Sequence, residues 1–563
     1  MRRLEPLWVL LGYAAASTVL IGRFWLRDRD DAVVGSFGAD QGFFAWSLVH
    51  WVETLAGNQA PFLTDRIDAP MGFNLAWATT IPGPALLLAP LTELAGPLAS
   101  YNLLAIAAPA LAAWSAYLLC RHLTRDLVAA LVGGWAFGFS SYLLGQTLNH
   151  VNLALVWALP LIVLVAIRLI EGSLRPRRGL LALAALIAMQ FLTFTEVAAT
   201  ATLVGGLTLA AALALGPADL RGRIVRALPW IAGGYALALV LVSPLLIAAL
   251  LHPNPIDRRI RPELYPLDVH NLFVPTAITW IGGARFQADS LRFAGNLTEQ
   301  LGYVGPLLLL VALGGLIRWR RERWVWVVVI GIACSLVLAL GARLTYGGVA
   351  HWLMPWDLLS RLPLIRLALP TRIVVYAWLG IAVLAALFVA RRRRDRPGAF
   401  PLRLGIAVIA LACLLPTPRA DLWRTDLQTP SGITDGTATA DIPDDAVVLI
   451  LPYSFRGNGM YWQALDRMRY RMAGGYSAAA VPAGYVPYPV VYGFYRDELP
   501  ANPRQELLRY LAFTGTTWVL VDARFPGPWA QFLREAGGRR SEVGGVVRWR
   551  FDAAQVRAQV AGA

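Results

Sequence analysis

The sequence predicts a polytopic α-helical membrane protein, a bundle of spans followed by a small α/β domain. Three observations lead to this fold class. Of the 563 residues, 57% are hydrophobic and only 15% are charged, and the mean hydropathy is +0.54. Long apolar runs recur over roughly the first 415 residues, which is typical of chains that cross a bilayer repeatedly. After residue 416 the apolar residues follow the periods of short strands and amphipathic helices instead.

The basic residues orient the predicted spans. The chain has no lysine, so all 50 basic residues are arginine, and the formal net charge is +15. The arginines gather in short clusters between apolar runs, as they do in cytoplasmic loops, so we expect a lipid bilayer and no nucleic acid as partner. The clusters that we place in the cytoplasm are Arg2–Arg3, Arg121/Arg125, Arg175/Arg177/Arg178, Arg221/Arg223/Arg226, 318–323 and 391–396.

This placement predicts eleven spans, with the N-terminus in the cytoplasm and the C-terminus outside. The first apolar run lacks a clear small-residue cleavage site, so we expect an uncleaved helix and not a signal peptide. Several spans have only about 15–18 residues, fewer than the ~20 of a full crossing. The proline-broken stretch 81–97 could be a half-span on the outer side; if it crosses fully, another segment must change too, and the count could reach thirteen. The spans lie near 6–22, 98–120, 127–145, 151–170, 179–195, 197–215, 228–250, 303–317, 324–341, 371–390 and 401–416.

The same topology divides the chain into a bundle, 1–416, and an extracytoplasmic α/β domain, 417–563. It also places the long polar loops 23–80, 251–302 and 342–370 outside. A linker rich in Pro, Thr, Gly and Asp follows the last span, as expected at a domain boundary. The tail elements that the pattern predicts are strands at 445–453 and 516–523 and helices at 503–513 and 528–537.

The first outer loop carries a lone acid in the stretch "SFGADQGFFAW". This acid, Asp40, precedes a segment, 43–57, whose apolar residues have helical spacing and include two tryptophans. Such a segment suits a helix lying in the membrane interface, where tryptophan is favoured. Asp65 and Asp68 follow in a loop before the chain enters the membrane again.

This order of elements resembles the GT-C class of integral-membrane glycosyltransferases, and in particular a largely uncharacterised bacterial branch of it. The resemblance covers about residues 1–305 well and the remainder loosely. It implies transfer of a sugar from a polyprenyl-phosphate carrier at the outer face of the membrane, with inversion and with a carboxylate as the base. The phrases that carry it are "ADQGFFAWSLVHW", "LTDRIDAPMGFNLAW", "PLTELAGPLASYNLLAI", "FGFSSYLLGQTLNHVNL" and, more distantly, "LFVPT" and "GNLTEQLGYVG".

Asp40 is the residue that we predict to be the base. Better-known members of the class have a tighter acidic pair at the end of the first span, whereas this chain offers "RDRDD" at 27–31 and then Asp40 alone. The alternative role for Asp40 is a helix N-cap, which aspartate favours. Asp65 and Asp68 are further catalytic candidates, although "TDRIDAP" also suits a simple turn.

Four residues near predicted helix ends are candidates for binding the donor. His150 could bind a phosphate or a sugar hydroxyl, or could be an interfacial histidine bonded to the backbone. Glu196 lies at the outer turn if 179–195 and 197–215 are two spans, and is buried if they form one; an acid at membrane depth is a functional candidate by default. Glu299 and Tyr303 open a span and could line the same cavity.

Arginines on the predicted outer side are exceptions to the charge rule. A phosphate-linked donor needs cations there, and arginine binds phosphate through paired hydrogen bonds. Arg366 and Arg372 flank a helix entry and are our candidates for the donor phosphate; lipid headgroups or the tail are the alternative partners. Other outer arginines include Arg258, Arg259, Arg261 and Arg361.

These observations predict a glycosyltransferase of the bacterial cytoplasmic membrane. Its substrates would be a polyprenyl-phosphate sugar and an envelope glycan, lipid or protein acceptor. No metal site is predicted, because the three cysteines have no CxxC partner; a divalent metal is compatible with the chemistry but is not indicated. The aromatic stretch 485–498 could stack on sugars or form the core of the tail domain. The competing functions are a non-enzymatic transporter or flippase of lipid-linked glycans, and a scaffold.

Overall fold

The computed structural model describes residues 4–562 except 27–30, 37–38, 254–255, 259–260, 363–364, 393–394 and 477–479, and it gives no side-chain placement for 256–258 and 480. Some predicted features therefore lie outside the described residues. They include Arg2, Arg3, the acids Asp28 and Asp30 of "RDRDD", Arg259, Arg393, Arg394 and the side chain of Arg258.

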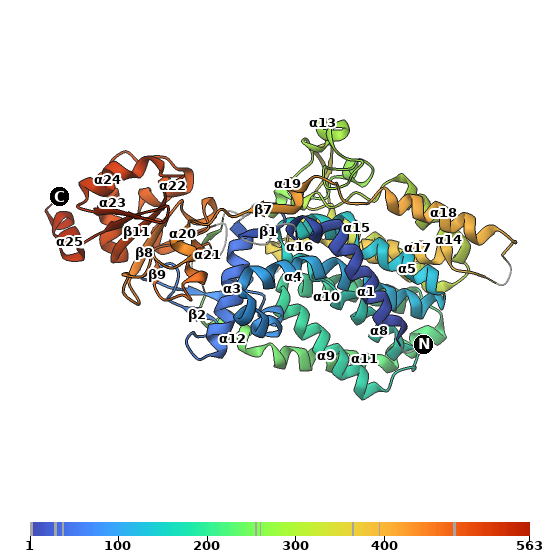
Figure 1. Ribbon diagram of the computed structural model, residues 1–563. Helices are drawn as coiled ribbons and strands as arrows, with labels where there is room; N and C mark the ends of the chain where they lie inside the picture. The colour runs from blue at the N-terminus through green and yellow to red at the C-terminus, as the bar shows by residue number, and fades with distance from the viewer. Residues whose placement is uncertain are drawn as a thin grey trace.

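An elongated molecule results, with a helical bundle at one end and a mixed sheet at the other (Figure 1). The bundle contains α1 (Glu5–Ser17), α2 (Arg23–Leu26), α4 (Pro82–Thr124), α5 (Leu127–Gly138), α6 (Ser141–Asn149), α7 (Val151–Ala154), α8 (Ala158–Ile170), α9 (Pro176–Thr193), α10 (Thr195–Leu215), α11 (Ala218–Leu241), α12 (Ser243–Leu251), α14 (Pro306–Trp319), α15 (Arg323–Ala339), α17 (Val374–Val389) and α18 (Ala399–Ala412).

All eleven predicted spans fall on helical segments. In the described part of the chain, six segments are long and apolar enough to cross a membrane, and α5 with α6, bent by 43°, would make a seventh. Helices α14, α15 and α18 are apolar but shorter. The six segments are Glu5–Leu26, Pro82–Thr124, Val151–Ile170, Thr195–Leu215, Ala218–Leu241 and Pro370–Val389.

The proline-broken stretch 81–97 is the first part of α4. This helix has 43 residues, and a straight helix of that length would measure about 65 Å, twice the hydrocarbon thickness of a bilayer. Gly96 interrupts it, with φ 84° and ψ 166°, just before Pro97. The predicted short segment is therefore a separate helical piece, and the predicted span 98–120 forms the second piece.

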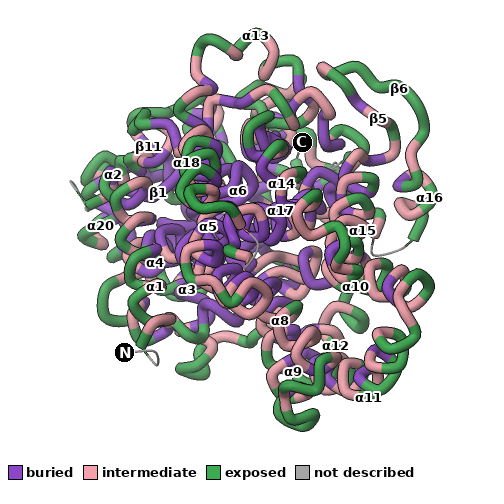
Figure 2. Tube along the Cα trace, turned by 90° about the vertical axis from the view of Figure 1, so that its right-hand side faces the viewer, coloured by how far each residue is buried: buried purple, intermediate pink, exposed green. Residues whose placement is uncertain are grey.

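The core of the bundle lies where α4, α5, α6 and α17 pack together, and Figure 2 shows the buried residues concentrated there. Small residues permit this close approach, because a Cβ on Gly138 of α5 would lie 2.4 Å from the Cβ of Ala113 on α4. By contrast, α9, α11 and α12 expose large apolar side chains such as Leu181, Val240 and Leu250. These peripheral helices have the apolar outer surface that a lipid-facing helix needs.

The helix predicted to lie in the membrane interface is present as α3 (Ala39–Leu55), but it is enclosed by protein. It packs between α4 and the tail helix α21 (Gly459–Leu465), and Phe43, Phe44 and Trp46 are all buried. The interfacial interpretation was wrong. A helix covered on several faces is apolar all round, and its sequence resembles that of an interfacial helix.

Residues from several of the predicted cytoplasmic arginine clusters meet at one end of the bundle. In Figure 1 the N-terminus and α18 lie on the right, and the tail lies on the left. This grouping agrees with the predicted sidedness, which stays a prediction. The contacts are Arg121–Glu5 (2.9 Å), the Arg391 N–H to Asp126 (3.3 Å), Arg318–Asp395 (3.2 Å) and Arg392–Glu322 (3.7 Å).

The tail contains the mixed sheet that the strand and helix pattern predicts. Its strand order is β12-β13-β11-β8-β9; β11 is parallel to β8 and β8 to β9, while β13 is antiparallel to its two neighbours. The predicted strands and helices at 445–453, 516–523, 503–513 and 528–537 are confirmed. The tail elements are β8 (Val447–Leu451), β9 (Arg471–Met472), α22 (Pro489–Arg496), α23 (Pro503–Thr514), β11 (Thr516–Asp522), α24 (Ala530–Glu535), β12 (Arg539–Val543), β13 (Val546–Arg550) and α25 (Ala553–Ala561).

The aromatic stretch 485–498 belongs largely to the core of this region. Tyr485, Val490, Val491 and Phe494 are buried against the sheet. The Tyr485 hydroxyl donates to the carbonyl of Ala69, 2.8 Å away. The core interpretation therefore accounts for this stretch.

Strand pairs and a helix contact join the tail to the predicted outer loops. β1 (Ala32–Val34) pairs with β7 (Arg424–Asp426), and β4 (Ile256–Arg258) pairs with β10 (Ala480–Pro482), both antiparallel. The indole N–H of Trp46 on α3 donates to Gln463 on α21 over 2.6 Å. The first and second predicted outer loops thus each contact the tail.

Candidate active site

Asp40 lies in the first turn of α3, where the backbone N–H groups of a helix have no acceptor within the helix itself. This position suits a carboxylate, because the amino end of a helix carries partial positive charge. The side chain of Asp40 is 25% exposed, so it is supported by protein yet reachable from outside. Asp40 is the second residue of α3 and its carboxylate points toward other side chains, so a simple N-cap does not describe its contacts.

Two side chains hold the Asp40 carboxylate, one from the tail and one from the bundle. The Tyr476 hydroxyl donates to Oδ1 over 2.7 Å, and Nε2 of His150 lies 3.4 Å from Oδ2. Burial and the neighbouring carboxylate raise the pKa of Tyr476, so its hydroxyl stays protonated and continues to donate. Tyr476 also packs edge-on against Phe43, which holds its ring beside α3.

His150 is placed by the end of α6. Ser140 caps the start of this helix by accepting from the N–H of Leu143, and His150 follows the last helical residue. Its Nδ1 lies 2.8 Å from Oε1 of Gln146, one helical turn earlier. With Nδ1 donating to Gln146, Nε2 can donate to Asp40 only as the imidazolium. The side-chain partners make His150 part of a polar network, unlike an interfacial histidine bonded to backbone.

A buried ion triad lies behind His150. Nε and Nη2 of Arg372 contact the Glu299 carboxylate at 3.0 and 2.5 Å, and Nη1 donates to Glu196 at 2.9 Å. Glu299 ends a short 3-10 turn, Leu297–Glu299; Arg372 lies in the turn Pro370–Ile373; Glu196 opens α10. A break at Phe194 separates α9 from α10, so Glu196 lies at a turn between two helices and is also largely buried.

The triad and the Asp40 cluster meet at His150. Its Nδ1 lies 3.9 Å from Oε1 of Glu299, which continues the chain of polar contacts from Tyr476 to Glu196. Asp40 is more exposed than Glu299, whose side chain is only 2% exposed and is occupied by arginine. Among these acids, Asp40 is the one with the access that a general base needs.

Asp65 and Asp68 take part in a different set of contacts. Asp65 is largely exposed and lies 3.4 Å from Nε of Arg66, which also pairs with Asp445 of the tail. Asp68 is buried, and its backbone N–H donates to Gly474. Burial raises the pKa of the Asp68 carboxyl to about 7. Both acids lie where the first loop meets the tail.

The remaining predicted residues are also separate from the Asp40 cluster. Arg366 is exposed on the turn Ile365–Leu367. Tyr303 is buried, with its hydroxyl close to Gly305. Arg361 pairs with Asp357, 3.1 Å away, on the surface. Among the residues that the structure describes, no group of three or more His, Cys, Asp or Glu side chains could hold a metal ion.

Sequence reasoning missed Tyr476 and Gln146. Gln146 stands four residues before His150, just beyond the predicted span 127–145, and the i, i+4 spacing of a continued helix could have indicated the contact. Tyr476 stands in "AGGYSAAA" with no motif around it, and only the docking of the tail brings it to Asp40.

Comparison with solved structures identifies the fold. The chain resembles the arabinofuranosyltransferase AftD from Mycobacteria, with a TM-score of 0.58 and 13% identity over 96% of this chain. It also resembles the oligosaccharyltransferase AglB from Archaeoglobus fulgidus, with a TM-score of 0.50 and 12% identity over 97% of this chain and 74% of that one. This chain spans only 39% of AftD. The likeness shows a GT-C-like fold.

A search of curated proteins finds no significant match. A family model does match, over residues 9–415, and this segment contains Asp40, His150, Glu196, Glu299 and Arg372 but not Tyr476. The chain therefore belongs to the family described as a domain of unknown function, DUF6311.

Proposed function

We propose that the protein is a membrane glycosyltransferase that moves a sugar from a polyprenyl-phosphate donor to an acceptor outside the cytoplasmic membrane. The acceptor would be an envelope glycan, a lipid or a protein. One observation carries the proposal: in a GT-C-like fold, the partly exposed carboxylate of Asp40 is held by Tyr476 and His150. The similar solved structures include two named transferases, which agrees with this chemistry.

In this reaction Asp40 acts as the base. Its carboxylate takes the proton of the acceptor hydroxyl while the hydroxyl oxygen bonds to the anomeric carbon. The bond from that carbon to the phosphate oxygen breaks, and polyprenyl phosphate leaves with the electron pair, so the centre inverts. A positioned base contributes about 10²–10⁴-fold to such a rate. Tyr476 and His150 position the carboxylate by holding one oxygen each.

Arg366 is the better candidate for the donor phosphate. Its side chain is exposed, whereas the guanidinium of Arg372 is already engaged by two carboxylates. A phosphate approaching Arg372 would meet a triad of net charge −1, one arginine against two glutamates. Arg372 would then act by fixing Glu299 beside His150.

The proposed orientation has the N-terminus in the cytoplasm and the 417–563 domain outside. It is supported by the arginine clusters that meet at one end of the bundle, opposite the tail. Asp40 and the tail would then face the side on which lipid-linked donors are used, in a bacterial cytoplasmic membrane.

The test is a donor assay. Purified protein in nanodiscs is incubated with a panel of polyprenyl-phosphate hexoses and pentoses and with envelope extracts as acceptor, and mass spectrometry follows donor consumption. We expect wild type to consume one donor and Asp40→Asn to consume it much more slowly. Consumption by neither protein, together with movement of a labelled lipid-linked glycan across the bilayer, would favour the transporter function instead.

A further inference from the structure

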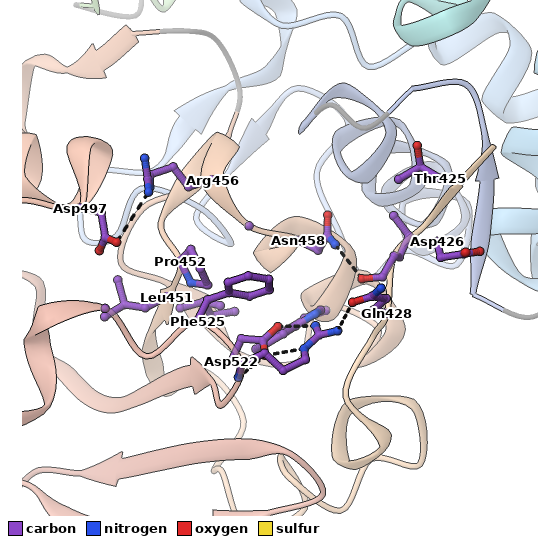
Figure 3. A pocket seen from close by; sticks show the side chains of 16 residues that line it. Thr425, Asp426, Gln428, Leu451, Pro452, Arg456, Asn458, Asp497, Asp522 and Phe525 are labelled. Atoms are coloured by element: carbon purple, nitrogen blue, oxygen red, sulfur yellow. Dashed lines mark hydrogen bonds and ion pairs between the residues drawn. The ribbon is translucent and has the colours of Figure 1, made fainter. Parts of the chain in front are cut away.

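A cavity of about 550 Å³ lies in the tail, at the carboxyl ends of the parallel strands β8 and β11. Leu451 and Pro452, at the end of β8, form one part of its wall, and Asp522, the last residue of β11, forms another (Figure 3). Its volume is within the range of small-molecule sites. The linker residues 425–428 close it from the side of the bundle.

The sheet topology favours a ligand site at this position. After β8 the chain continues to β9, at one edge of the sheet. After β11 it continues to β12 and β13, which lie toward the opposite edge. A crevice opens between adjacent parallel strands whose connections diverge in this way, and open α/β sheets bind ligands there. The cavity lies at that point.

The two arginines that line it are each paired with an aspartate, which argues against an anionic ligand. Arg524 forms two bonds to Asp522, at 2.9 and 2.5 Å, and a third to the amide oxygen of Gln428 at 2.9 Å. Arg456 lies 3.6 Å from Asp497. A phosphate or carboxylate would have to displace a carboxylate from one of these arginines and would meet the repulsion of both acids.

The same groups suit a ligand covered with hydroxyls. A hydroxyl both donates and accepts, and the cavity offers N–H donors on Arg456 and Arg524 beside carboxylate and amide oxygens. Asp522 is buried and held in place, so the polar wall is pre-organised. Phe525 contributes an aromatic ring that is 58% exposed, so part of the ring is available to a ligand, and the Arg524 guanidinium lies 5.5 Å from its centroid.

We infer that this cavity binds a neutral saccharide. The ring of Phe525 packs against the apolar face of a sugar, and the paired Arg and Asp groups bind its hydroxyls. A neutral sugar keeps both ion pairs intact, whereas a nucleotide or phosphosugar does not.

The position of the cavity suggests what the saccharide is for. The linker residues that line the cavity overlap and follow β7, and β7 pairs with β1 of the first loop. Asp31, next to β1, accepts hydrogen bonds from Thr429 of the same linker. The first loop leads from β1 to Asp40. A saccharide held here would be part of a glycan acceptor whose other end reaches Asp40; this role rests on the proposed function, whereas saccharide binding itself does not.

The experiment measures saccharide binding by the full-length protein in nanodiscs, which avoids competition from alkyl-glycoside detergents. The labelled protein is applied to an array of neutral oligosaccharides together with hexose phosphates and sulfated sugars, and affinities of the hits are measured by calorimetry. We expect binding to neutral oligosaccharides and at least tenfold weaker binding by Phe525→Ala and by Gln428→Ala. Both side chains are exposed, so the variants should fold.

Phe455→Ala is the matched control. Phe455 is 45% exposed and stacks on Tyr495, but it is not among the residues that line the cavity, so its removal should leave saccharide affinity unchanged. Asp40→Asn should also bind saccharide normally, which separates this inference from the proposed reaction. Absence of binding to every neutral sugar, preference for phosphorylated or sulfated sugars, or equal effects of Phe525→Ala and Phe455→Ala would overturn the inference.

Discussion

The hydroxyl of Tyr476 lies 2.7 Å from Oδ1 of Asp40, although the two residues are 436 positions apart in the chain. The bond joins the tail to the first turn of α3, and it gives the exposed carboxylate a fixed direction. Several consequences of this contact and its neighbours can be measured.

Tyr476→Phe removes the hydroxyl but keeps the ring that packs on Phe43. A hydrogen bond to a charged group contributes about 1.5–3 kcal/mol, so we expect turnover to fall about 10- to 100-fold while the melting temperature changes little. Tyr346→Phe, on an exposed hairpin strand, is the control and should keep full activity. Equal turnover for the two variants would show that the Tyr476 hydroxyl has no role in catalysis.

Asp40→Asn tests the base directly. Asparagine has nearly the same size as aspartate and is equally well suited to the start of a helix, but its side-chain amide cannot act as a base. We expect a folded protein with normal donor binding and turnover lower by about 10²-fold or more. Asp65→Asn, at an exposed acid of the same loop, should keep normal turnover. If Asp40→Asn kept wild-type turnover, Asp68 and the acids of 27–31 would be the next candidates.

Arg372→Met tests the buried triad. It would leave Glu299 and Glu196 charged and without their cation, and breaking a buried ion pair in this way costs about 3–5 kcal/mol. We expect a clear fall in melting temperature, partly restored when Glu299→Gln is added. A stable Arg372→Met single variant would contradict the triad.

Arg366→Ala is the counterpart of that variant, since both remove an arginine from the same short segment. Arg366 is exposed, so its loss should change stability by no more than about 0.5 kcal/mol. If it binds the donor phosphate, donor affinity should fall by about 1.5–3 kcal/mol, measured as competition with a labelled polyprenyl-phosphate sugar.

Asp68 predicts a pH dependence of stability. Burial raises its pKa to about 7 in the folded protein, above the ordinary value near 4. Between these values the folded state binds more protons than the unfolded state, so this residue's contribution to stability is complete below pH 4 and is lost as the pH rises through 7. Asp68→Asn should remove this loss. Asparagine also tolerates the left-handed backbone at this position, φ 55°. Melting temperatures from pH 5 to 8 that fall equally in both proteins would reject the assignment.

The orientation of the bundle is tested with single cysteines in a variant lacking the three native ones. Asp435→Cys in the tail should react with an impermeant thiol reagent in intact spheroplasts, and Arg396→Cys between α17 and α18 should not. Both positions are exposed, so accessibility reports sidedness. The reverse labelling pattern would place Asp40 in the cytoplasm and remove the basis for a lipid-linked donor.

The sequence was most informative where a pattern is local. Apolar runs predicted the helices, and the strand periods in the tail predicted β8 and β11. These predictions were possible because a buried helix or strand has apolar residues at regular intervals in the sequence. Asp40 and Glu196 could be selected as candidates because isolated acids stand out in an apolar chain. The interfacial assignment of α3 was wrong because a helix covered by another part of the protein and a helix exposed to lipid are both rich in apolar residues, so composition does not distinguish them.

Pairings across the chain could not be predicted. Arg372, Glu299 and Glu196 were each visible as unusual charges, but no spacing relates three residues on separate elements. Arg372 was interpreted as a phosphate ligand because its partners were unknown. Tyr476 carried no signal, since its contact exists only when the tail docks on α3.

The Tyr476–Asp40 bond can form only late in synthesis, because its two residues lie far apart in the chain. Asp40 leaves the ribosome early, whereas its tyrosine partner follows more than four hundred residues later. During that interval the carboxylate lacks one of the two side chains that hold it. The strand pair between β1 and β7 would form first, as its second member precedes Tyr476 in the chain. Under the proposed function, the base would therefore be fully oriented only after the chain has been synthesised beyond residue 476 and the tail has packed on α3.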